Sequence, residues 1–580
     1  MNNVRVWEEV ELVFETEGDW GNPYVEVEVW VDLEGPGFAK RLYGFWDGGE
    51  IFKVRLTAMV PGEWKWVSGA NVEDGGLVGK RGGFIAEAWE EEELEENPNR
   101  RGTVRATADG RGLEYADGTP LFLLGDTWWS VPTFRYPWFD DDEVRPVGPE
   151  MGFKDMIRYR KEQGFNSIAI LAALPNWAND GEKSQLETEE GIGIRSAWGD
   201  PRTGSAKDMH NSGGRPFEFP GKIPGFENVF PDVDRINPAY FREFDLKMSH
   251  MAEQGFVPFL EAARRDCTQA WQEYYEWPGS YTRYVRYVWS RYQARNVVFS
   301  PIHFDWKMFA AHPRDFNAVG NALMREYGMP PFGQLVSANS NPSSLSHFGG
   351  EDEAPWIGLH QTGNRREHEF YWYLTEIFHA DPPKPALNGE PYYSGLKLGD
   401  QVGAEGNTVR DDRYVRSGMY GSFLSGGFAG HIYGVQGLWG GDVEEGAGVM
   451  QWDALEWSSA GYVKHLKTFA FCEGTRFREL VPNAELVCPN KTGPGKGYEG
   501  WAFCARSSER DLFLLYFEKG CPQATVRGAL HDAVYEATWF DVRKGVWIEA
   551  GEVKADEMEC VHLPGFPDGE DWGLRLMLKG

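Results

Sequence analysis

The chain has 580 residues, more than one compact hydrophobic core holds, so two to four domains are expected. Its 58 basic residues stand against 89 acidic ones, and the net charge of −31 disfavours nucleic acids and anionic membranes as partners. No apolar run approaches the ~20 residues of a membrane span, and the N-terminal MNNVRVWEEVELVF lacks the pattern of a secretion signal.

Aromatic residues and cysteines add two expectations. The chain holds 25 Trp, 24 Tyr and 36 Phe, an abundance that suits surfaces on which sugar rings stack. Six cysteines are scattered without a CxxC pair or a metal-like spacing, so they are expected to be reduced thiols. The expected location is therefore the cytoplasm, and neither a cofactor nor a metal is expected.

Residues 1–87 alternate in polarity with a period of two. YVEVEVWVD places Val25, Val27, Val29 and Val31 on one face, and FKVRLTAMVPGEWKWVSG is typical of two strands around a Pro-Gly turn. This pattern predicts an N-terminal β-sandwich. The acidic stretch AWEEEELEENPNRRG follows, and residues 88–102 are predicted to be a solvated linker.

Between residues 103 and 467 strands alternate with helices. Apolar strands are predicted at PLFLLGD, NSIAILAAL, FVPFLEAA, NVVFSPIHFD, GQLVSANS, WIGLHQ, KPALNGE and AGHIYG, with amphipathic helices such as FKDMIRYRKEQG between several of them. Eight strands with interposed helices predict an α/β fold, a (β/α)8 TIM barrel. Its largest loop, at about 175–235, follows the second strand. Residues 475–580 return to strand alternation and predict a C-terminal β-sandwich.

In such a barrel the functional side chains lie at the carboxyl ends of the strands. Because side chains alternate along a strand, parity predicts which of them point into the barrel mouth, including apolar ones such as Phe122 and Phe299. The polar residues selected in this way are Asp126 on strand one, Glu261 on strand three, His303 and Asp305 on strand four, His360 on strand six, Asn388 and Glu390 on strand seven, and His431 and Tyr433 on strand eight.

Four of these strands end on a carboxylate. One such acid would most simply cap a helix or a turn, but several converging on one rim favour a functional site, which tolerates their mutual repulsion. One carboxylate as acid/base and one as nucleophile, beside Trp and Tyr platforms, are the equipment of glycoside hydrolysis. The sequence has no GxSxG, Walker, Rossmann or HExxH motif that would indicate other chemistry.

Several stretches resemble a known family. GDTWW at the end of strand one, NGEPYYSG at strand seven and RDDRYVRSGMYGSFLSGGFAGHIYGVQGLWG through strand eight resemble the apiosidase-like glycoside hydrolases, whose (β/α)8 domains are related to the clan A glycosidases. The leading sandwich resembles the small β-domain that often precedes such barrels. YEATWFDVRKGVWIEAG is similar to the β-domain, labelled collagen-binding, that often follows them.

The resemblance implies a retaining mechanism, with a nucleophile on strand seven and an acid/base at the end of strand four. Glu390 matches the first role. Clan relatives commonly carry Asn-Glu on strand four, where this chain has His303 and Phe304, whereas apiosidases use Asp, which favours Asp305; Glu261 is the alternative. The residues expected to bind substrate are Asp126, Trp128, Trp129, Glu261, His303, His360, Asn388, Tyr393, His431, Tyr433 and Trp439.

Two geometric expectations follow for the pair. The carboxyl groups of Asp305 and Glu390 should lie about 5–5.5 Å apart, the spacing for retention, rather than ~6.5–9.5 Å, the spacing for inversion. The ionised Glu390 should also raise the pKa of Asp305, because a second negative charge is disfavoured nearby. Asn388 and Tyr393 are expected to supply the hydrogen bonds that hold Glu390.

Three functions are compatible with these patterns. The first is an intracellular retaining glycosidase that acts on oligosaccharides. The second is a carbohydrate-binding pseudoenzyme that has lost the acid on strand four. The third takes the collagen-binding label literally, as an adhesion protein, and the N-terminal sequence argues against it. The sequence identifies neither the sugar nor its linkage, and it leaves exo or endo cleavage and homo-oligomer formation open.

Overall fold

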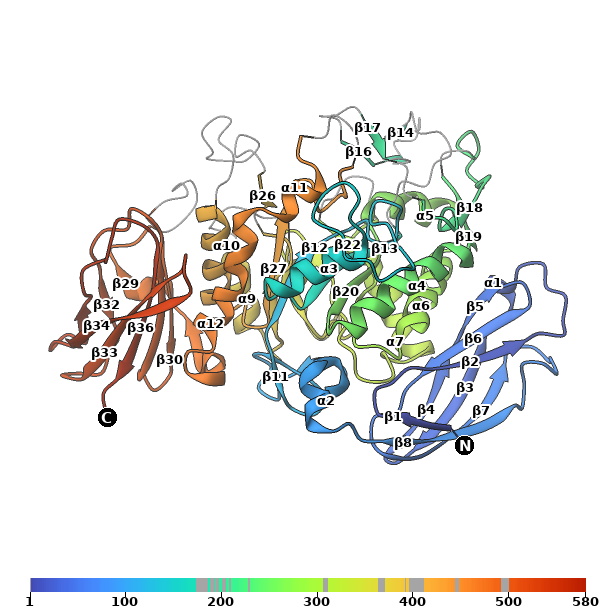
Figure 1. The fold of residues 1–580 in the computed structure, drawn as a ribbon, viewed down its shortest axis with the longest axis horizontal. Helices are drawn as coiled ribbons and strands as arrows, with labels where there is room; N and C mark the ends of the chain where they lie inside the picture. The colour runs from blue at the N-terminus through green and yellow to red at the C-terminus, as the bar shows by residue number, and fades with distance from the viewer. Residues whose placement is uncertain are drawn as a thin grey trace.

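The computed structural model describes residues 2–173, 210–227, 230–305, 311–363, 371–391, 393–395, 412–443, 448–491 and 500–580, with short strands at 186–187, 193–194, 198–200 and 205–207. Much of the long loop predicted at 175–235 therefore lies outside the described residues. Figure 1 shows three regions in a row, with the strand-and-helix region between two regions made of sheets.

Two sheets with a common core form the N-terminal region. Alternate residues such as Val29, Val31 and Leu33 are buried against Val54 and Leu56 of the facing sheet. One sheet has the order β1 (Asn2–Arg5), β8 (Arg81–Glu87), β7 (Gly62–Ala70), β3 (Val29–Gly35), β4 (Phe38–Tyr43), and the other the order β2 (Val10–Glu15), β6 (Ile51–Leu56), β5 (Phe45–Gly48).

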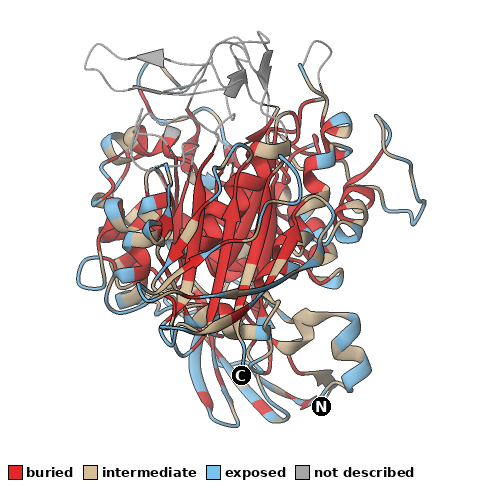
Figure 2. Ribbon diagram, turned by 90° about the vertical axis from the view of Figure 1, so that its left-hand side faces the viewer, coloured by how far each residue is buried: buried red, intermediate tan, exposed pale blue. Residues whose placement is uncertain are grey.

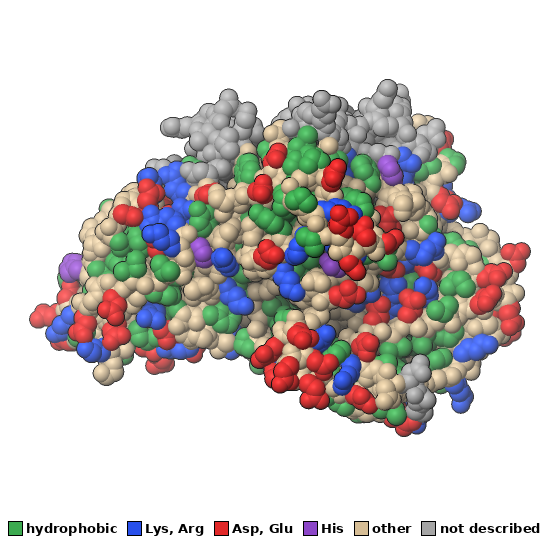
Figure 3. All heavy atoms as spheres, in the orientation of Figure 1, with side chains coloured by type: hydrophobic (Ala, Val, Ile, Leu, Met, Phe, Trp, Pro, Cys, Tyr) green, Lys and Arg blue, Asp and Glu red, His purple; other side chains and the backbone are tan. Residues whose placement is uncertain are grey.

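The structure adds two details to the sequence prediction for this part of the chain. The strand predicted around Val25 begins only at Val29, because Pro23 starts the short helix α1 (Pro23–Glu26) and Val25 is exposed. The predicted linker folds as the helix α2 (Glu91–Glu96) and the 3₁₀ turn η1 (Pro98–Arg101). The acidic side chains of α2 gather at the lower edge of the face in Figure 3, where acidic and basic groups are otherwise interspersed.

Parallel strands form the centre of the molecule, in the order β21 (Val298–Ser300), β20 (Val257–Ala263), β13 (Ser167–Ala173), β12 (Leu123–Thr127), β27 (Gly430–Val435), β25 (Ala386–Asn388), β24 (His360–Thr362). β22 (His303–Phe304) pairs with β23 (Asn339–Ser340). Isolated parallel bridges join Phe299 to Val336 and Ser337 to Leu359. The arrangement is TIM-barrel-like, and Figure 2 shows its strands as almost wholly buried.

Helices surround these strands. They appear where the amphipathic patterns predicted them, and Gly164 and Gly255 follow the ends of α3 and α4 with positive φ, the conformation that favours glycine at a helix end. The main helices are α3 (Phe153–Glu162), α4 (Pro238–Glu253), α6 (Gly279–Tyr292), α7 (Asp315–Glu326), α9 (Trp372–His379), α10 (Asp412–Leu424) and α12 (Val463–Ala470).

The C-terminal region again contains two sheets. It packs against α10 and α12, where Arg416 pairs with the buried Asp571 at 2.7 Å and the ring of Phe469 stacks on Trp547. The sheets have the orders β28 (Leu480–Pro482), β30 (Ala502–Ser507), β31 (Leu512–Phe517), β36 (Trp572–Leu578), β33 (Val534–Asp541), β34 (Val546–Lys554) and β29 (Val487–Cys488), β32 (Thr525–Arg527), β35 (Cys560–His562).

Two further features concern the chain as a whole. None of the helices in the described residues has the length and apolar character needed to cross a bilayer. The six cysteines all lie in described segments, and none of them forms a disulfide.

Candidate active site

Two apolar clusters show which way each strand residue points. One cluster lies inside the ring of strands, and the other fills the space between the strands and the helices. Leu123, Val257, Phe259, Val298, Leu359, Leu387 and Ile432 belong to the inner cluster, whereas Phe122, Leu124, Leu260, Phe299, Phe304, Trp356 and Tyr433 belong to the outer one. Polar residues at the carboxyl ends of the strands form the site, and of these Glu261 continues the inner parity of its own strand.

Glu261 and His303 form a buried ion pair at this end. Glu261 continues the inner parity of Phe259 in β20, and its Oε2 lies 2.5 Å from Nδ1 of His303. Both side chains are 1% exposed. Burial raises the pKa of Glu261 to about 7, although His303 opposes the rise. Burial lowers the pKa of His303, but the Glu261 and Asp305 carboxylates outweigh it and raise the value to about 10. His303 is therefore an imidazolium at neutral pH.

Asp305 lies on the other side of His303. Its Oδ1 is 3.3 Å from Nε2 of His303 and 2.7 Å from Nη1 of Arg265, and its Oδ2 is 3.2 Å from Nη2 of Arg264. Burial raises the pKa of Asp305, but the two guanidinium groups and His303 hold it well below its usual range. The prediction of a raised pKa for Asp305 is wrong, because the two arginines and His303 outweigh the effect of burial.

Glu390 completes the cluster from strand seven. Its Oε1 accepts a hydrogen bond from the Tyr393 hydroxyl at 2.8 Å, and its Oε2 accepts one from Asn339 Nδ2 at 3.4 Å. The bond from Tyr393 was predicted from the sequence. Asn388 acts differently from the prediction, since its Oδ1 accepts from the backbone N–H of Glu390 and its Nδ2 donates to Ser422. It shapes the backbone at the strand end.

The two carboxylates are close together. His303, Asp305 and Glu390 each contribute an atom to a group whose atoms lie within 4.8 Å of one another, and all three residues are buried. Nε2 of His303 is 3.9 Å from Oε2 of Glu390. Such a group could in principle hold a metal ion, but a protonated imidazole cannot coordinate one and two guanidinium groups repel a cation. The imidazolium and the two guanidinium groups suit an ionised Asp305 instead.

Aromatic rings lie beside this cluster. The ring of Trp129 is 4.5 Å from the His303 ring, centroid to centroid, and Trp129 belongs to the inner cluster. The Tyr393 ring stacks on Trp439 at 6.3 Å. The backbone N–H of Trp129 donates to the Trp439 carbonyl, which joins the ends of strands one and eight. Trp129, Tyr393 and Trp439 thus form the apolar part of the site.

Six of the predicted site residues lie on the other side of the strands. Asp126 pairs with Arg160 of α3, Trp128 packs against Phe153 of α3, and Asn388 reaches Ser422 of α10. His360 forms a hydrogen bond with Ser344 of α8 (Ser344–Phe348), and Tyr433 forms one with Ser459. His431 points away from the interior, because its neighbour Ile432 belongs to the inner cluster. Burial lowers the pKa of both His360 and His431 to about 3, so both are neutral core residues.

The alternation of side chains did not predict the orientation of these residues correctly, because the strands are apolar on both faces. The strands of a barrel contact side chains inside and helices outside, so the apolar residues do not show which face is which. In strand four the alternation of side chains is interrupted between β21 and β22. Phe299 and Ile302 both face the helices there, although one has an odd and the other an even number. Phe299 is consequently outside the mouth, whereas His303 and Asp305 are inside it. Glu261 follows the predicted parity.

The sequence reasoning missed Arg264, Arg265 and Asn339. The two arginines follow strand three directly, in the sequence EAARRD, and Asn339 lies in the sequence SANS at the end of strand five. The two arginines could have been predicted by considering the first two residues after each strand as well as the last residue within it.

Comparison with known proteins identifies the family of the chain. A family model described as the apiosidase-like catalytic domain matches residues 107–473, more than half of the chain. A domain of unknown function, DUF5060, matches residues 3–71. No curated protein matches the sequence.

Solved structures are similar in fold. A proposed glycoside hydrolase of Bacteroides vulgatus ATCC 8482 is 16% identical and aligns over 100% of both chains with a TM-score of 0.66. A glycoside hydrolase family 5 protein of the same organism is 17% identical, with a TM-score of 0.56 over 83% of this chain and 94% of that one. A further protein, named glycoside hydrolase, is 17% identical with a TM-score of 0.57 over 83% of this chain and 98% of that one. The chain therefore belongs to the apiosidase-like family, and it is a glycosidase.

Proposed function

We propose that this protein hydrolyses glycosidic bonds with retention, using Glu390 as the nucleophile and Asp305 as the carboxylate that meets the leaving oxygen. The observation that carries the proposal is the closeness of the two groups, since an oxygen of each lies within 4.8 Å of the other. Retaining enzymes hold their carboxyl groups about 5–5.5 Å apart, whereas inverting enzymes leave ~6.5–9.5 Å for a water molecule.

Glu390 has the surroundings that a nucleophile needs. The Tyr393 hydroxyl and the Asn339 amide both donate to its oxygens, and the protonated His303 lies 3.9 Å away. All three favour the ionised carboxylate, because they stabilise negative charge. The same donors hold the side chain in one orientation toward the centre of the mouth, where an anomeric carbon would be attacked.

The proton for the leaving group requires a separate source. Arg264 and Arg265 keep Asp305 ionised, so Asp305 does not carry a proton of its own in the free protein. His303 carries one and touches Asp305 through Nε2, while Glu261 holds the opposite nitrogen. In our proposal, the sugar displaces an arginine from Asp305, and His303, held by Glu261, then transfers its proton to Asp305. In this proposal Glu261 supports Asp305 through His303 and does not replace Asp305 as the acid/base.

The substrate is proposed to be an oligosaccharide or glycoside. Trp129 and the stacked pair Tyr393 and Trp439 offer flat apolar surfaces next to the carboxylates, which suit the C–H faces of sugar rings. The net charge of −31 favours neither nucleic acids nor anionic membranes as partners.

Two broader expectations belong to this proposal. A complete (β/α)8 barrel flanked by two β-sandwiches is supported by the parallel order of the central strands and by the two sheets at each end. A cytoplasmic location is supported by six cysteines that form no disulfide among the described residues. Cell fractionation with an antibody would test the location, and recovery outside the cytoplasm would refute it.

A panel of aryl glycosides tests the mechanism. Once a substrate is found, Asp305→Asn should reduce kcat/KM strongly for poor leaving groups and far less for activated ones such as dinitrophenyl glycosides, because activated groups need little proton donation. Added azide should restore turnover of the activated substrates. Equal losses for both substrate types would show that Asp305 does not protonate the leaving group.

A further inference from the structure

The strand-eight loop (residues 436–442) contains Trp439, whose ring is half-buried, whereas Trp129 and Tyr393 are buried. The loop follows β27 and contains neither helix nor strand, so its carbonyl groups lack the partners that regular secondary structure supplies. The Trp439 ring stacks on Tyr393, whose hydroxyl donates to Glu390. The groups that hold this loop therefore determine where Trp439 lies relative to the proposed nucleophile.

Four consecutive carbonyl groups of this loop accept hydrogen bonds from the strand-one loop (residues 128–136). The donors are the Tyr136 hydroxyl to Leu438, the Trp129 N–H to Trp439 at 3.0 Å, the Ser130 hydroxyl to Gly440 at 2.9 Å and Arg135 Nη1 to Gly441 at 2.8 Å. A Cβ added at Gly441, whose φ is +64°, would lie 2.9 Å from Ser130 Oγ, so glycine permits this close approach. The strand-eight loop thus takes its position from the strand-one loop.

A buried lysine holds the strand-one loop in turn. The side chain of Lys247, in α4, is 0% exposed, and its Nζ donates to the Val131 carbonyl at 2.8 Å and to the Thr133 carbonyl at 2.9 Å. Glu243 Oε1 lies 3.9 Å from Nζ, beyond hydrogen-bond distance. Lys247 consequently acts as a donor to backbone carbonyls rather than as half of a close ion pair.

Packing alone does not explain a lysine at this position. Burial lowers the pKa of Lys247 to about 7, although Glu243 opposes the fall, so the charged form is disfavoured here. A methionine would fill a similar space without a buried amine. The lysine adds N–H donors for two carbonyl groups, and an amine keeps two such donors whether or not it is protonated. Because buried carbonyl groups need donors, Lys247 stabilises the turn at residues 131–133.

We propose that Lys247 is a positioning residue for Trp439: it fixes the strand-one loop, and that loop fixes the ring on which a sugar packs. The inference rests on the proposed function in assigning Trp439 to sugar binding. Lys247 lies on a helix outside the ring of strands and contacts the backbone of the strand-one loop, so it acts on the placement of the ring and not on the reacting atoms. Its loss should therefore weaken substrate binding more than it slows the chemical step.

Lys247→Met tests this placement in the aryl-glycoside assay. It keeps the length of the side chain and removes both donors, so kcat/KM should fall about tenfold, mainly through a higher KM. In a protein that already carries Trp439→Ala, the same substitution should lower kcat/KM by less than about threefold, because the ring that it positions is absent. Equal losses with and without Trp439, or an unchanged KM, would overturn the proposal.

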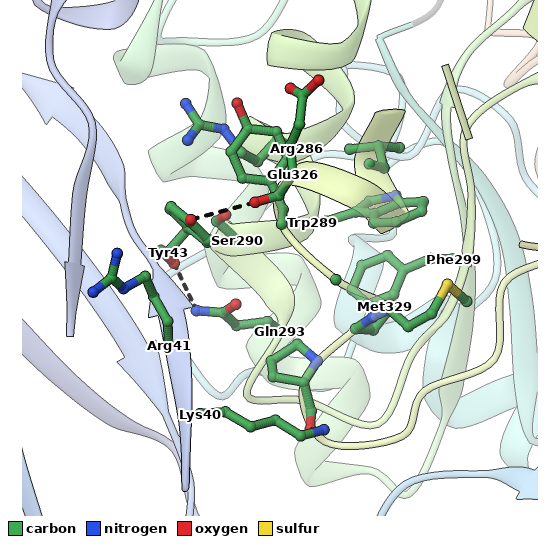
Figure 4. Close-up of a pocket in the computed structure, with 15 residues that line it drawn as sticks. Lys40, Arg41, Tyr43, Arg286, Trp289, Ser290, Gln293, Phe299, Glu326 and Met329 are labelled. Carbon is green, nitrogen blue, oxygen red and sulfur yellow. Dashed lines mark hydrogen bonds between the residues drawn. The ribbon is translucent and has the colours of Figure 1, made fainter. Parts of the chain in front are cut away.

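Gln293→Met is the matched control. Gln293, at the end of α6, donates from Nε2 to the carbonyls of Tyr43 at 2.8 Å and Arg55 at 2.9 Å. Figure 4 shows the first of these bonds, in a cavity that β4 and α6 help to line. Both substitutions remove two hydrogen bonds to backbone carbonyls, so both should lower the Tm, but only Lys247→Met should change kcat/KM. An equal loss of kcat/KM in Gln293→Met would show general destabilisation and would contradict the proposal.

Tyr136→Phe tests the same contacts if Lys247→Met does not fold. It preserves the ring, which stacks on Trp128, and removes the hydroxyl that donates to the Leu438 carbonyl. KM should rise severalfold in the otherwise wild-type protein and less in a protein with Trp439→Ala. An unchanged KM would show that the two loops are not coupled, and the proposal would fail.

Affinity measurements separate this proposal from the proposed function. Glu390→Gln should bind an aryl glycoside selected from the panel without cleaving it, so titration calorimetry can give its Kd with and without Lys247→Met. We expect about tenfold weaker binding when Lys247 is replaced. Equal Kd values would refute the role of Lys247 and leave that of Glu390 intact. An active Glu390→Gln protein would refute the mechanism, and the KM values would still decide the role of Lys247.

Discussion

Asp126 and Glu390 are both buried carboxylates at the ends of barrel strands, yet they do different work. Asp126 faces the helices, where Arg160 Nε donates to it at 2.6 Å and Trp128 Nε1 at 2.8 Å. Glu390 faces the barrel interior, where one of its oxygens lies within 4.8 Å of atoms of Asp305 and His303. Burial at a strand end therefore does not identify a functional acid. What identifies it is convergence with a second carboxylate inside the barrel.

The arginines of the two sites sharpen this contrast. Burial raises the pKa of Asp126 and outweighs the opposing effects of Arg160, Trp128 and the Thr127 backbone N–H. Asp305 is equally buried, but its two arginines and His303 lower its pKa well below the usual range. The Asp126 pair holds helix α3 on strand one, and such a pair contributes mainly by leaving no charge unpaired. In our proposal, the arginines at Asp305 are instead groups with which a substrate competes.

Glu390→Gln should produce the largest effect. The amide keeps the shape but cannot attack an anomeric carbon, so kcat for aryl glycosides should fall by about 10⁵-fold while the Tm stays close to that of the wild type. Assays on purified, folded protein would measure both quantities. An active and well-folded variant would remove Glu390 from the mechanism.

Asp126→Asn should show the opposite pattern. It leaves Arg160 buried without a charged partner, which costs roughly 3–5 kcal/mol of unfolding free energy. Denaturant unfolding measures this loss, and kcat/KM should change little in the protein that remains folded. If the variant were stable but inactive, Asp126 would have to act in the chemistry, and the distinction between the two acids would fail.

The adjacent tryptophans offer a matched pair. Trp129→Ala should lower kcat/KM by about tenfold or more with a small change in Tm, because it removes an aromatic surface beside His303. Trp128→Ala should mainly destabilise, by roughly 3–5 kcal/mol, because Trp128 is buried against Tyr136 and Phe153. Steady-state kinetics and denaturant unfolding of both variants test this, and a reversed pattern would exchange their roles.

The pH dependence of stability should show the smallest effect. The pKa of His303 is raised to about 10, so its stabilising charge is complete below pH 6.5 and is lost as the pH rises through 10. The Tm should fall more steeply between pH 7 and 10 in the wild type than in His303→Gln. Glu261, with a pKa of about 7, titrates at the lower edge of this window, so the comparison is sharpest between pH 8 and 10. Parallel Tm curves for the two proteins would show that His303 is neutral in the folded state.

The sequence predicted the architecture better than the orientation of its residues. The eight strand sequences and the main helices lie where the apolar patterns put them, because chain periodicity fixes secondary structure locally. Glu390, Asp305, Glu261 and Tyr393, each marked by a strand end or a motif, lie near one another as predicted. Asp126, His360 and His431 were misplaced because barrel strands bury both faces, and the sequence does not distinguish the inner face from the outer one.

The stereochemistry of hydrolysis tests the central claim most directly. The claim is that Glu390 attacks the sugar while Asp305, close beside it, serves the leaving group. Proton NMR of the first-formed product from an aryl glycoside reports its anomeric configuration before mutarotation. The account predicts the same configuration in product and substrate. A product of inverted configuration would mean that water attacks directly, and Glu390 would then not be the nucleophile.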